Sequence, residues 1–294
     1  MPEVSVVIVC MNRPDILFPC LDSIREGNAS AVLETFVVAY CFTAENLALL
    51  KERYPWVRVV PSKEVRGFSE NNNLALKQAG GRFCFIVNDD TIVPPGTIQA
   101  LVDDLGRLPS EAAAVSPKIV FPSGKVQTSG RAPWSRWRYA RHYLHMVDET
   151  KPTKWSMKEG LFRTYTLNGA CFLIRTDIFR ELGFFDERYF FTPEDIALGH
   201  ALNDAGFTVW ADSDISITHY AGGSVSAMER AIKPARVRGS MIFYGEPFLL
   251  KCFIWCVEAL RSLKYIGKPN SARNVMRTVF SKQTPKEIFI RFRP

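Results

Sequence analysis

Three clusters of polar residues carry side chains that could act together on one ligand. Asn88-Asp89-Asp90 comes directly after the apolar run of residues 83–87, and Thr192-Pro193-Glu194-Asp195 is the second cluster. The third is His219, in the run ITHYAGGS. Carboxylates at the end of a buried strand need a positive partner, such as a divalent metal that carries a phosphorylated ligand. A rigidly held carboxylate can also serve as a general base, and a neutral imidazole is a common metal ligand.

Each cluster also has a purely structural explanation. Asn and Asp end strands and begin turns in many proteins, which would account for residues 88–90. Thr192 would make a good N-cap and Pro193 suits the first helical position, with Asp195 close to the place of a capping box. The two explanations of this cluster are compatible, because a helix N-terminus beside a cleft holds a carboxylate rigidly. A lone histidine such as His219 often belongs to a core or a loop.

Two stretches rich in aromatic residues could line such a site. Residues 183–195, GFFDERYFFTPED, place five aromatics around a few charges, and an exposed loop of this kind suits stacking on a sugar ring. Residues 131–141 interleave arginines with Trp134, Trp137 and Tyr139. Such a mixture can bind a nucleic-acid strand, and it can equally bind the diphosphate of an acceptor or an anionic glycan. Because it is one irregular loop in an enzyme-like chain, we expect no nucleic acid as a partner.

The elements that must position these clusters alternate between strands and helices. Short apolar runs predict strands at residues 4–10, 36–40, 57–60 and 83–87. Helical spacing predicts helices at residues 14–26, 45–54 and 69–78. This alternation predicts an α/β fold with a mostly parallel central sheet that is covered by helices on both faces. Ligands bind at the carboxyl ends of the strands in such a sheet, and the first polar cluster stands there.

The second half of the chain is less regular. Helices are predicted at residues 96–105, 177–182 and 193–205, and strands at residues 113–120 and 170–175. Between these elements, residues 130–160 lose any period, and we interpret them as a long irregular insertion near the site. We therefore expect one domain over residues 1–228, which the resemblance given below implies to be nucleotide-sugar-binding and catalytic, followed by a helical extension over residues 229–294.

The extension is basic and contains an amphipathic helix. Residues 230–294 hold 14 Lys and Arg against 3 Asp and Glu, a net charge of +11, whereas the first 229 residues carry a net charge of −4. Such an asymmetry of net charge indicates a docking surface and gives no information about the fold. Residues 248–265 predict a helix with one polar sector and a broad apolar face, which could pack on its own domain or lie on a membrane surface. The polar sector consists of Lys251, Glu258, Arg261 and Lys264.

Composition and missing motifs narrow the class of protein. The chain has 294 residues, of which 47% are hydrophobic and 23% are charged, as is typical of a globular protein. Its seven cysteines are scattered without a C-x-x-C pair, so we expect reduced thiols, no zinc knuckle and a cytoplasmic location. The first residues lack the features of a signal peptide, and no apolar stretch is long enough to span a membrane. No P-loop, dinucleotide fingerprint or nucleophile elbow occurs, which argues against those nucleotide-binding and hydrolase classes.

Four motifs in order resemble the family 2 glycosyltransferases, and the rhamnosyltransferase-like bacterial members are the most similar. The motifs are SVVIVCMNRP, RGFSENNNLALKQAGGRFCFIVNDDT, NGACFLIRTDIFRELGFFDERYFFTPEDIALGHAL and HYAGGS, within residues 4–224. The resemblance implies a GT-A fold with a Rossmann-like sheet, and inverting transfer of a sugar from a nucleotide diphosphate donor to a glycan or lipid-linked glycan. It also implies hexosyl transfer, with rhamnosyl transfer as one candidate, in cell-envelope polysaccharide biosynthesis at the inner face of the cytoplasmic membrane.

The resemblance implies roles for particular residues. Asp90 falls on the metal-binding acid of the D-x-D or N-x-D motif and would hold Mg²⁺ or Mn²⁺, with His219 completing that site. Asp195 falls on the catalytic base, and its neighbour Glu194 is the less favoured candidate for that role. The remaining matches fall on donor or acceptor-sugar contacts. They are Asn12, Arg13, Arg66, Gly67, Asn73, Asn88, Asp89, Gly169 and Ala170.

Two positions depart from the family pattern. Asn88 replaces the first acid of a strict D-x-D motif, and residues 39–43, AYCFT, stand where the family often has an acid that contacts the nucleotide base. The identities of the nucleotide, the donor sugar and the acceptor are therefore open at this stage. The departures motivate an alternative function, namely a catalytically silent module that binds a sugar nucleotide.

Overall fold

The computed structural model describes residues 3–27, 33–127, 130–148, 151, 153–156, 158–220, 228–263 and 270–293. Two expectations fall outside these residues: the Gly-Gly pair that follows His219, and the last two residues of the helix predicted at residues 248–265. The remaining predicted elements can be compared with the structure.

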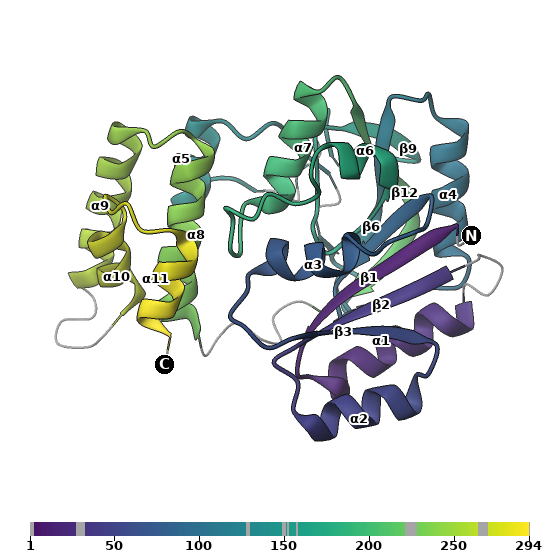
Figure 1. The fold of residues 1–294 in the computed structure, drawn as a ribbon. Helices are drawn as coiled ribbons and strands as arrows, with labels where there is room; N and C mark the ends of the chain where they lie inside the picture. The colour runs from purple at the N-terminus through teal and green to yellow at the C-terminus, as the bar shows by residue number, and fades with distance from the viewer. Residues whose placement is uncertain are drawn as a thin grey trace.

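One ten-stranded sheet forms the centre of the fold (Figure 1). Its strands are β1 (Val4–Met11), β2 (Leu33–Tyr40), β3 (Val57–Ser62), β4 (Phe83–Val87), β5 (Thr91–Ile92), β6 (Ala112–Val120), β7 (Val126–Gln127), β9 (Leu161–Thr164), β11 (Cys171–Arg175) and β12 (Thr208–His219). Eight of them follow the order β3-β2-β1-β4-β11-β6-β12-β5, while β7 pairs with β6 and β9 pairs with β12. A separate antiparallel pair consists of β8 (Gly130–Arg131) and β10 (Thr166–Leu167).

Six strands of the sheet run in one direction. Strands β3, β2, β1 and β4 pair in parallel, and so do β6 and β12. Strand β11 is antiparallel to both β4 and β6, so β6 runs in the same direction as β4. The expected mostly parallel α/β sheet is therefore confirmed. Its inner strands, such as the fully buried FCFIV of β4, are continuous apolar runs because helices cover both of their faces.

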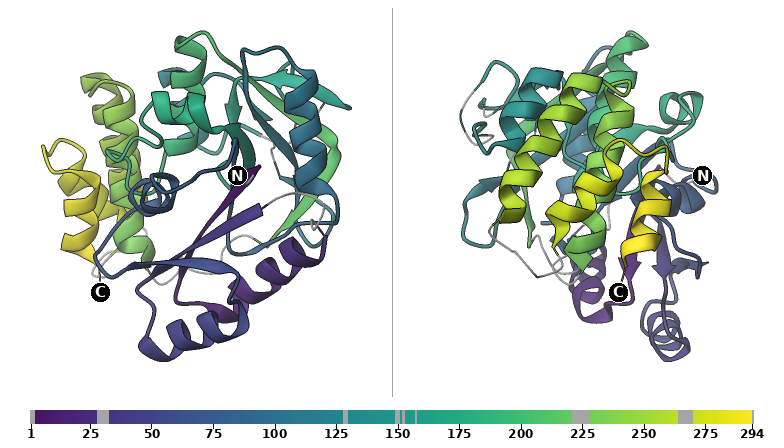
Figure 2. Two further views of the ribbon diagram at one scale, coloured as in Figure 1. Left: turned by 45° about the vertical axis from the view of Figure 1, so that its right-hand side comes forward. Right: turned by 90° about the vertical axis from the view of Figure 1, so that its left-hand side faces the viewer.

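Six helices cover the two faces of the sheet (Figure 2). Alternate residues of β1 point to opposite faces. On one face Ile8 belongs to the same core as Leu17 and Leu101. On the other face Val7 shares a core with Leu76 and Leu198. The helices of the first face are α1 (Pro14–Gly27), α2 (Ala44–Arg53) and α4 (Thr97–Arg107), and those of the second are α3 (Phe68–Leu76), α6 (Thr176–Glu181) and α7 (Glu194–Asp204).

A group of helices stands beside the sheet, at the left of Figure 1. Four of them come from the C-terminal part of the chain: α8 (Glu229–Phe243), α9 (Phe248–Leu263), α10 (Ser271–Thr278) and α11 (Pro285–Phe292). Helix α11 also contacts the catalytic part, since Phe289 packs on Phe190 with ring centroids 4.9 Å apart. The predicted helical extension is thus present, while the domain boundary at residue 228 stays a prediction.

The expectation of an irregular stretch at residues 130–160 is wrong for its central part. Residues Arg136–Tyr143 form helix α5, which Ser135 caps by accepting a hydrogen bond from the Arg138 N–H (3.1 Å). Trp134 and Tyr139 are buried in a core that includes residues of α8 and α9. The helix therefore depends on tertiary packing against distant segments, which local propensity does not reveal.

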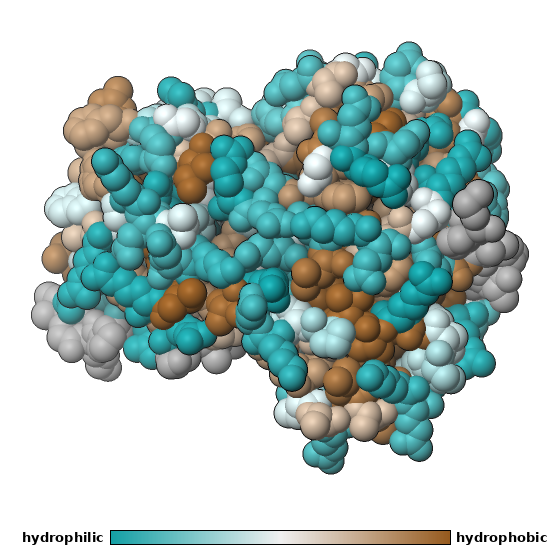
Figure 3. All heavy atoms as spheres, in the orientation of Figure 1, coloured by the Kyte–Doolittle hydropathy of each residue, from teal (hydrophilic) through white to brown (hydrophobic). Residues whose placement is uncertain are grey.

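Helix α9 turns its charges inward. Glu258 is fully buried and accepts hydrogen bonds from Lys233 Nζ (2.6 Å), Arg261 Nη1 (2.6 Å) and the Tyr143 hydroxyl (2.8 Å). Glu258 and Arg261 of the predicted polar sector thus face the neighbouring helices together with Leu250 and Ile254, whereas other apolar side chains of α9 face outward. The exposed apolar residues of α9 are Phe248, Leu249, Trp255, Leu260 and Leu263. Figure 3 shows apolar atoms at the outer edge of the group, where α9 begins. None of the helices described is long and apolar enough to cross a membrane.

Candidate active site

A short antiparallel pairing brings Asp90 and His219 together. Thr91 of β5 lies opposite His219 at the end of β12, and the Tyr220 N–H donates to the Asp90 carbonyl (3.0 Å). As a result, His219 Nε2 lies 3.1 Å from Asp90 Oδ1 and 3.3 Å from Asn88 Nδ2. The first and third polar clusters of the sequence therefore meet at one edge of the sheet.

The chemistry of this pair fits a divalent cation. Gln127 Oε1 lies 2.9 Å from His219 Nδ1, so the neutral tautomer with its proton on Nδ1 would donate to Gln127 and keep a lone pair on Nε2. That lone pair and the Asp90 carboxylate are both electron donors, so a cation suits the space between them. Within the described ranges no group of three or more His, Cys, Asp and Glu side chains could hold a metal ion. The pair resembles Mg²⁺ sites in which one or two protein ligands leave positions for phosphate oxygens.

A cavity of about 630 Å³ opens beside this pair and is called the donor cavity below. Its size is within the usual range of ligand pockets, roughly 300–1,000 Å³. Two arginines of the C-terminal segment, Arg236 and Arg293, line it together with predicted site residues. The predicted residues in its wall are Arg66, Gly67, Asn88, Asp89, Asp90 and His219. This mixture of carboxylates and guanidinium groups suits a metal-bound diphosphate.

Asp89, in the wall of the donor cavity, has a raised pKa. Burial raises the pKa of Asp89 to about 6, and the charge of Asp90 also raises it. A hydrogen bond with the Cys10 side chain acts in the opposite direction. Two adjacent carboxyls with different environments are a common feature of functional sites.

Five predicted donor or acceptor-sugar contacts lie outside the lining of the donor cavity, namely Asn12, Arg13, Asn73, Gly169 and Ala170. Asn12 Oδ1 accepts hydrogen bonds from the Thr43 N–H (3.0 Å) and from Asn46 Nδ2 (2.9 Å). Asn12 thereby ties the turn after β1 to the start of α2. The Arg13 guanidinium pairs with the exposed carboxylate of Asp15 at 2.8 Å. A direct contact of Asn12 or Arg13 with a nucleotide stays a prediction.

Gly67 and Asn73 hold α3 against the aromatic loop of residues 183–195. A Cβ atom at Gly67 would lie 2.1 Å from the Phe190 carbonyl oxygen, so only glycine fits there. Asn73 donates to the Phe185 carbonyl (2.9 Å) and accepts from the Phe185 N–H (3.2 Å). The expectation that this loop is exposed for stacking is wrong, because three of its aromatics are buried. They are Phe185, Tyr189 and Phe190. Within this loop, Phe191 does line the donor cavity.

Asp195 is held by three donors at the start of α7. Its Oδ1 accepts from the Ile196 N–H (2.8 Å), and its Oδ2 accepts from the Gly169 N–H (3.1 Å) and from Arg131 Nη1 (3.0 Å). The residue is only 9% exposed. The carboxylate is therefore fixed in orientation by its own helix, by a second backbone segment and by a guanidinium group.

Gly169 and Ala170 connect Asp195 with the metal-binding candidates. Gly169 binds the Asp195 carboxylate, and the next residue, Ala170, accepts a hydrogen bond from the Asn88 N–H (2.9 Å). A Cβ atom at Gly169 would lie 3.4 Å from the Asp195 Cβ atom, so the two segments are closely packed. All three polar clusters thus lie around one short stretch of backbone.

The predicted N-cap at Thr192 is wrong. Helix α7 begins at Glu194, Pro193 is its N-cap residue, and no side chain caps it. The Thr192-Pro193 peptide bond is cis. The backbone here is packed against α8, since a Cβ atom at Gly239 would lie 2.4 Å from the Thr192 carbonyl oxygen. Asp195 still stands in the first turn of the helix, where the helix dipole favours a carboxylate.

Glu194 differs from its neighbour Asp195. Its side chain is buried, and Oε2 makes no hydrogen bond in the described part of the chain. Burial raises the pKa of Glu194 well above its usual value, and the charge of Asp195 raises it further, while Arg236 and Arg131 lower it. A raised pKa favours the protonated form of Glu194, which disfavours this residue as a general base.

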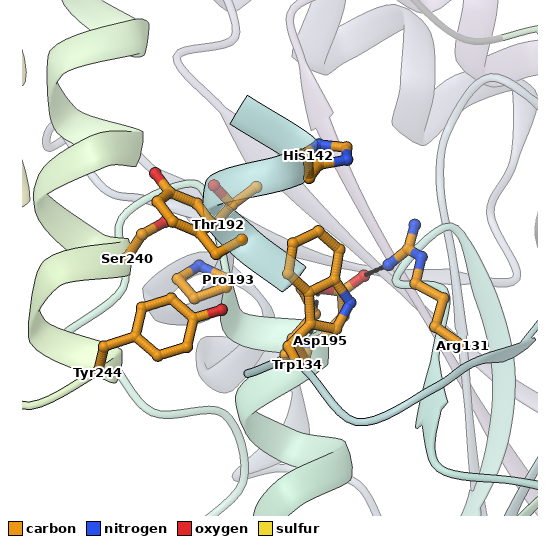
Figure 4. A pocket seen from close by; sticks show the side chains of 10 residues that line it. Arg131, Trp134, His142, Thr192, Pro193, Asp195, Ser240 and Tyr244 are labelled. Atoms are coloured by element: carbon orange, nitrogen blue, oxygen red, sulfur yellow. Dashed lines mark hydrogen bonds and ion pairs between the residues drawn. The ribbon is translucent and has the colours of Figure 1, made fainter. Parts of the chain in front are cut away.

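A second cavity, of about 230 Å³, adjoins Asp195 and is called the aromatic cavity below (Figure 4). In Figure 4 the Asp195 carboxylate lies between Trp134 and Arg131, and Tyr244 and Ser240 project from helix α8. The complete lining is Arg131, Trp134, Tyr139, His142, Thr192, Pro193, Asp195, Ile196, Ser240 and Tyr244. The basic-aromatic stretch at residues 131–141 is therefore partly folded into this wall, which disfavours a surface for nucleic acid.

Several residues of the two cavities carry no local signal in the sequence. Gln127 belongs to the two-residue strand β7, and no motif singles it out. Arg236 and Arg293 belong to a segment with many basic residues, so their position in the donor cavity depends on how α8 and α11 pack. Ser240 and Tyr244 reach the aromatic cavity for the same reason.

Comparison with known proteins identifies similar sequences and folds. A model of "Glycosyltransferase like family 2" matches residues 2–233. The chain is 27% identical over 226 residues to the O-antigen biosynthesis protein RfbC of Myxococcus xanthus, which covers 76% of this chain and 18% of that protein. It is 26% identical over 223 residues to the N-acetylglucosaminyl-diphospho-decaprenol L-rhamnosyltransferase of Mycobacterium tuberculosis, which covers 66% of this chain and 69% of that protein. The chain thus spans less than a fifth of the first relative.

A solved structure supports the fold assignment. The mannosyltransferase PcManGT of Pyrobaculum calidifontis, in complex with GDP-Man and Mn²⁺, matches with a TM-score of 0.57 at 17% identity. The match covers 98% of this chain and 85% of the other. Structural similarity at 17% sequence identity supports the assignment of the GT-A fold and nothing more specific.

Proposed function

The chain belongs to the glycosyltransferase-like family 2, and from this premise we propose that it transfers a sugar from a nucleotide diphosphate donor with inversion at the anomeric carbon. The donor would occupy the donor cavity. Its diphosphate would meet Arg66, Arg236 and Arg293, which line that cavity. Arginine suits this task because its planar group binds phosphate oxygens in pairs.

Asp90 and His219 would hold a Mg²⁺ or Mn²⁺ ion together with the donor diphosphate. The ion would supply charge neutralisation on that diphosphate, a contribution of roughly several kcal/mol. Gln127 supports this role because its contact with Nδ1 keeps Nε2 of His219 available. The alignment of Asp90 with the family's metal-binding acid points in the same direction.

Asp195 would act as the general base. A hydroxyl oxygen of the acceptor forms a bond to the anomeric carbon while the bond from that carbon to the diphosphate oxygen breaks. The electron pair of the broken bond leaves with the diphosphate, and the proton of the hydroxyl passes to Asp195. Arg131 and the Gly169 N–H keep the carboxylate oriented, and a positioned base of this kind contributes about 10²- to 10⁴-fold to the rate.

One observation carries this proposal above the others. Gly169 binds Asp195, and the next residue, Ala170, binds the backbone of Asn88. These two consecutive residues therefore connect the base with the segment that leads to the metal-binding candidate Asp90. A donor whose diphosphate is bound at Asp90 would therefore place its sugar close to Asp195. A capping role for Asp195 alone would not require this connection.

The acceptor proposed is a glycan or a lipid-linked glycan, reached at a membrane surface. The name of the mycobacterial relative describes transfer to a diphospho-decaprenol, which motivates the lipid-linked form. Helix α9 exposes apolar side chains, and residues 230–294 carry a net charge of +11. An apolar helix face within a basic segment is suited to an anionic bilayer surface, where its side chains leave water.

The proposal is tested by donor binding followed by donor turnover. We expect one nucleotide sugar of a panel, offered with Mn²⁺, to raise the melting temperature, because a ligand of the folded state stabilises it by mass action. That donor should then be hydrolysed slowly without acceptor, with release of the nucleoside diphosphate. Binding without hydrolysis or transfer would instead identify a catalytically silent module. Failure of every nucleotide sugar to bind would contradict the proposal.

A further inference from the structure

We propose that the aromatic cavity is the acceptor site, and that it takes one sugar ring whose diphosphate lies on helix α5. This inference rests on the proposed function, since it assigns an acceptor to the same base. The cavity measures about 230 Å³. This is smaller than the roughly 300–1,000 Å³ typical of pockets for drug-sized ligands, so it suits a single ring.

The walls of the cavity suit the two faces of a sugar. Trp134 is 8% exposed and is held by an edge contact with His142 (5.0 Å between centroids) and by a tilted contact with Tyr139 (6.4 Å). Across from it, Tyr244 projects from α8 (Figure 4). Rigid aromatic rings of this kind pack against the C–H faces of a sugar while polar groups at their edges bind its hydroxyls.

Polar atoms of the wall are placed for the hydroxyl that reacts. Asp195 lines the cavity and is the base of the proposed reaction. Trp134 Nε1 is buried and has no hydrogen-bond partner among the described residues. A buried donor without a partner needs an explanation, and an oxygen atom of a bound ligand would supply one. We infer that an acceptor oxygen satisfies Trp134 while its reacting hydroxyl lies against Asp195.

A basic depression on the same helix is suited to the diphosphate. It measures about 330 Å³, and its charged lining residues are Arg138 and Arg141 of α5 together with Lys151 and Asp148, which follow the helix. Arg138 stands one helical turn before His142, which lines the aromatic cavity, so the two sites share α5. Arginines bind phosphate oxygens with charge-assisted hydrogen bonds. A sugar in the cavity could thus extend its diphosphate over α5.

The test compares two acceptors with the donor found by the thermal-shift panel. One is N-acetylglucosaminyl-diphospho-decaprenol, and the other is an alkyl N-acetylglucosaminide that has the same sugar without the diphosphate. Ser240→Leu fills the aromatic cavity and should raise the KM of both acceptors at least about tenfold, because a filled pocket rejects its ligand. The rise in melting temperature that the donor gives with Mn²⁺ should equal that of wild type, because Ser240 does not line the donor cavity.

The variant Arg141→Ser tests the binding of the diphosphate separately from the binding of the sugar. It should raise the KM of the diphosphate acceptor about tenfold or more and leave that of the glycoside unchanged, because a charge-assisted hydrogen bond is lost. Arg163→Ser, an exposed arginine on β9, is the matched control and should change neither value. Arg141→Ser kinetics equal to wild type with both acceptors would overturn the assignment of the diphosphate.

The outcomes distinguish this inference from the proposed function. Wild-type acceptor kinetics in a folded Ser240→Leu protein would overturn the acceptor site while the glycosyltransferase proposal stands. If Ser240→Leu does not fold, Trp134→Phe replaces it, and it should lower kcat/KM for both acceptors about fivefold or more by removing the N–H group and part of the ring face. Wild-type kinetics in that variant would likewise overturn the assignment of the aromatic cavity as the acceptor site.

A wild-type protein that hydrolyses donor but uses neither acceptor would overturn the sugar-diphosphate assignment. A protein that does not turn over any donor would contradict the proposed function itself.

Discussion

At the scale of single residues, Glu194 and Asp195 are consecutive carboxyls in different environments. Asp195 is bound by two backbone N–H groups and by Arg131, which suits a carboxylate. Glu194 is buried, and burial raises the pKa of Glu194 well above its usual value. Neighbouring acids whose environments separate them in this way can take different roles in one site. We therefore assign the base to Asp195 and a neutral structural role to Glu194.

The first prediction concerns Glu194 and stability. Because its pKa is higher in the folded than in the unfolded state, the folded state binds more protons between these two pKa values, and stability falls as the pH rises through that window. Glu194→Gln removes this dependence. Relative to the variant, wild type should lose up to about 1.4 kcal/mol of unfolding free energy per pH unit above roughly pH 4.3. Urea unfolding at pH 5, 6, 7 and 8 measures this difference, and parallel pH curves for the two proteins would contradict it.

At the scale of elements, the sequence predicts the strands that are long and apolar. Strands β1 and β4 are continuous apolar runs, so their place in a buried parallel sheet follows from pattern alone. Strand β5 has two residues, and its pairing with β12 depends on contacts between segments far apart in the chain. The sequence therefore supplied Asp90 and His219 as candidates through motif resemblance, while the pairing that joins them is visible only in three dimensions.

Other elements were mispredicted for identifiable reasons. The aromatics of residues 183–195 alternate with charges and look exposed, but α3 and α11 cover them. Helix α5 combines arginines, which favour a helix, with Trp, Tyr and His residues of lower helix propensity. It forms against α9, where Arg261 Nη2 donates to the Tyr143 carbonyl (2.7 Å). In both cases, tertiary contacts decide the structure, and a single sequence does not contain them in readable form.

The second prediction concerns the outward face of α9. Leu249 and Leu260 are 82% and 68% exposed, and moving a leucine side chain out of water yields about 1.5–3 kcal/mol. The double variant Leu249→Glu/Leu260→Glu should therefore bind vesicles containing phosphatidylglycerol at least about tenfold more weakly than wild type. Sedimentation with vesicles measures this binding. Leu49→Glu, an exposed leucine of α2, is the matched control, and equal binding by all three proteins would argue against a membrane role for α9.

At the scale of the whole molecule, helix α8 takes part in both cavities. Ile232 and Arg236 line the donor cavity, and Ser240 and Tyr244, further along the same helix, line the aromatic cavity. Asp195 stands in the wall of the aromatic cavity, next to the segment that contacts Asn88. The basic C-terminal segment is therefore part of the proposed site as well as the proposed docking surface. Its contribution could not be read from charge alone, since only the packing of α8 and α11 selects Arg236 and Arg293.

The third prediction follows from this arrangement. Arg236→Ala should raise the KM of the nucleotide-sugar donor about tenfold or more, because it removes a charged group from the proposed diphosphate site. The KM of the acceptor should stay unchanged. Steady-state kinetics with both substrates varied separate these values. Arg230→Ala, an exposed arginine on the same helix, is the control, and an Arg236→Ala protein with the donor KM of wild type would rule out this contact.

The central claim is that Asp195 is the base of a sugar transfer, and the transfer rate of Asp195→Asn tests it most directly. The measurement compares Asp195→Asn with the matched variant Glu194→Gln, using one donor, one acceptor and Mn²⁺. We predict that Asp195→Asn lowers kcat about 10²- to 10⁴-fold while its donor affinity stays near wild type, because only the proton acceptor is lost. Glu194→Gln should keep most of the activity. Near-normal turnover by Asp195→Asn would contradict the account.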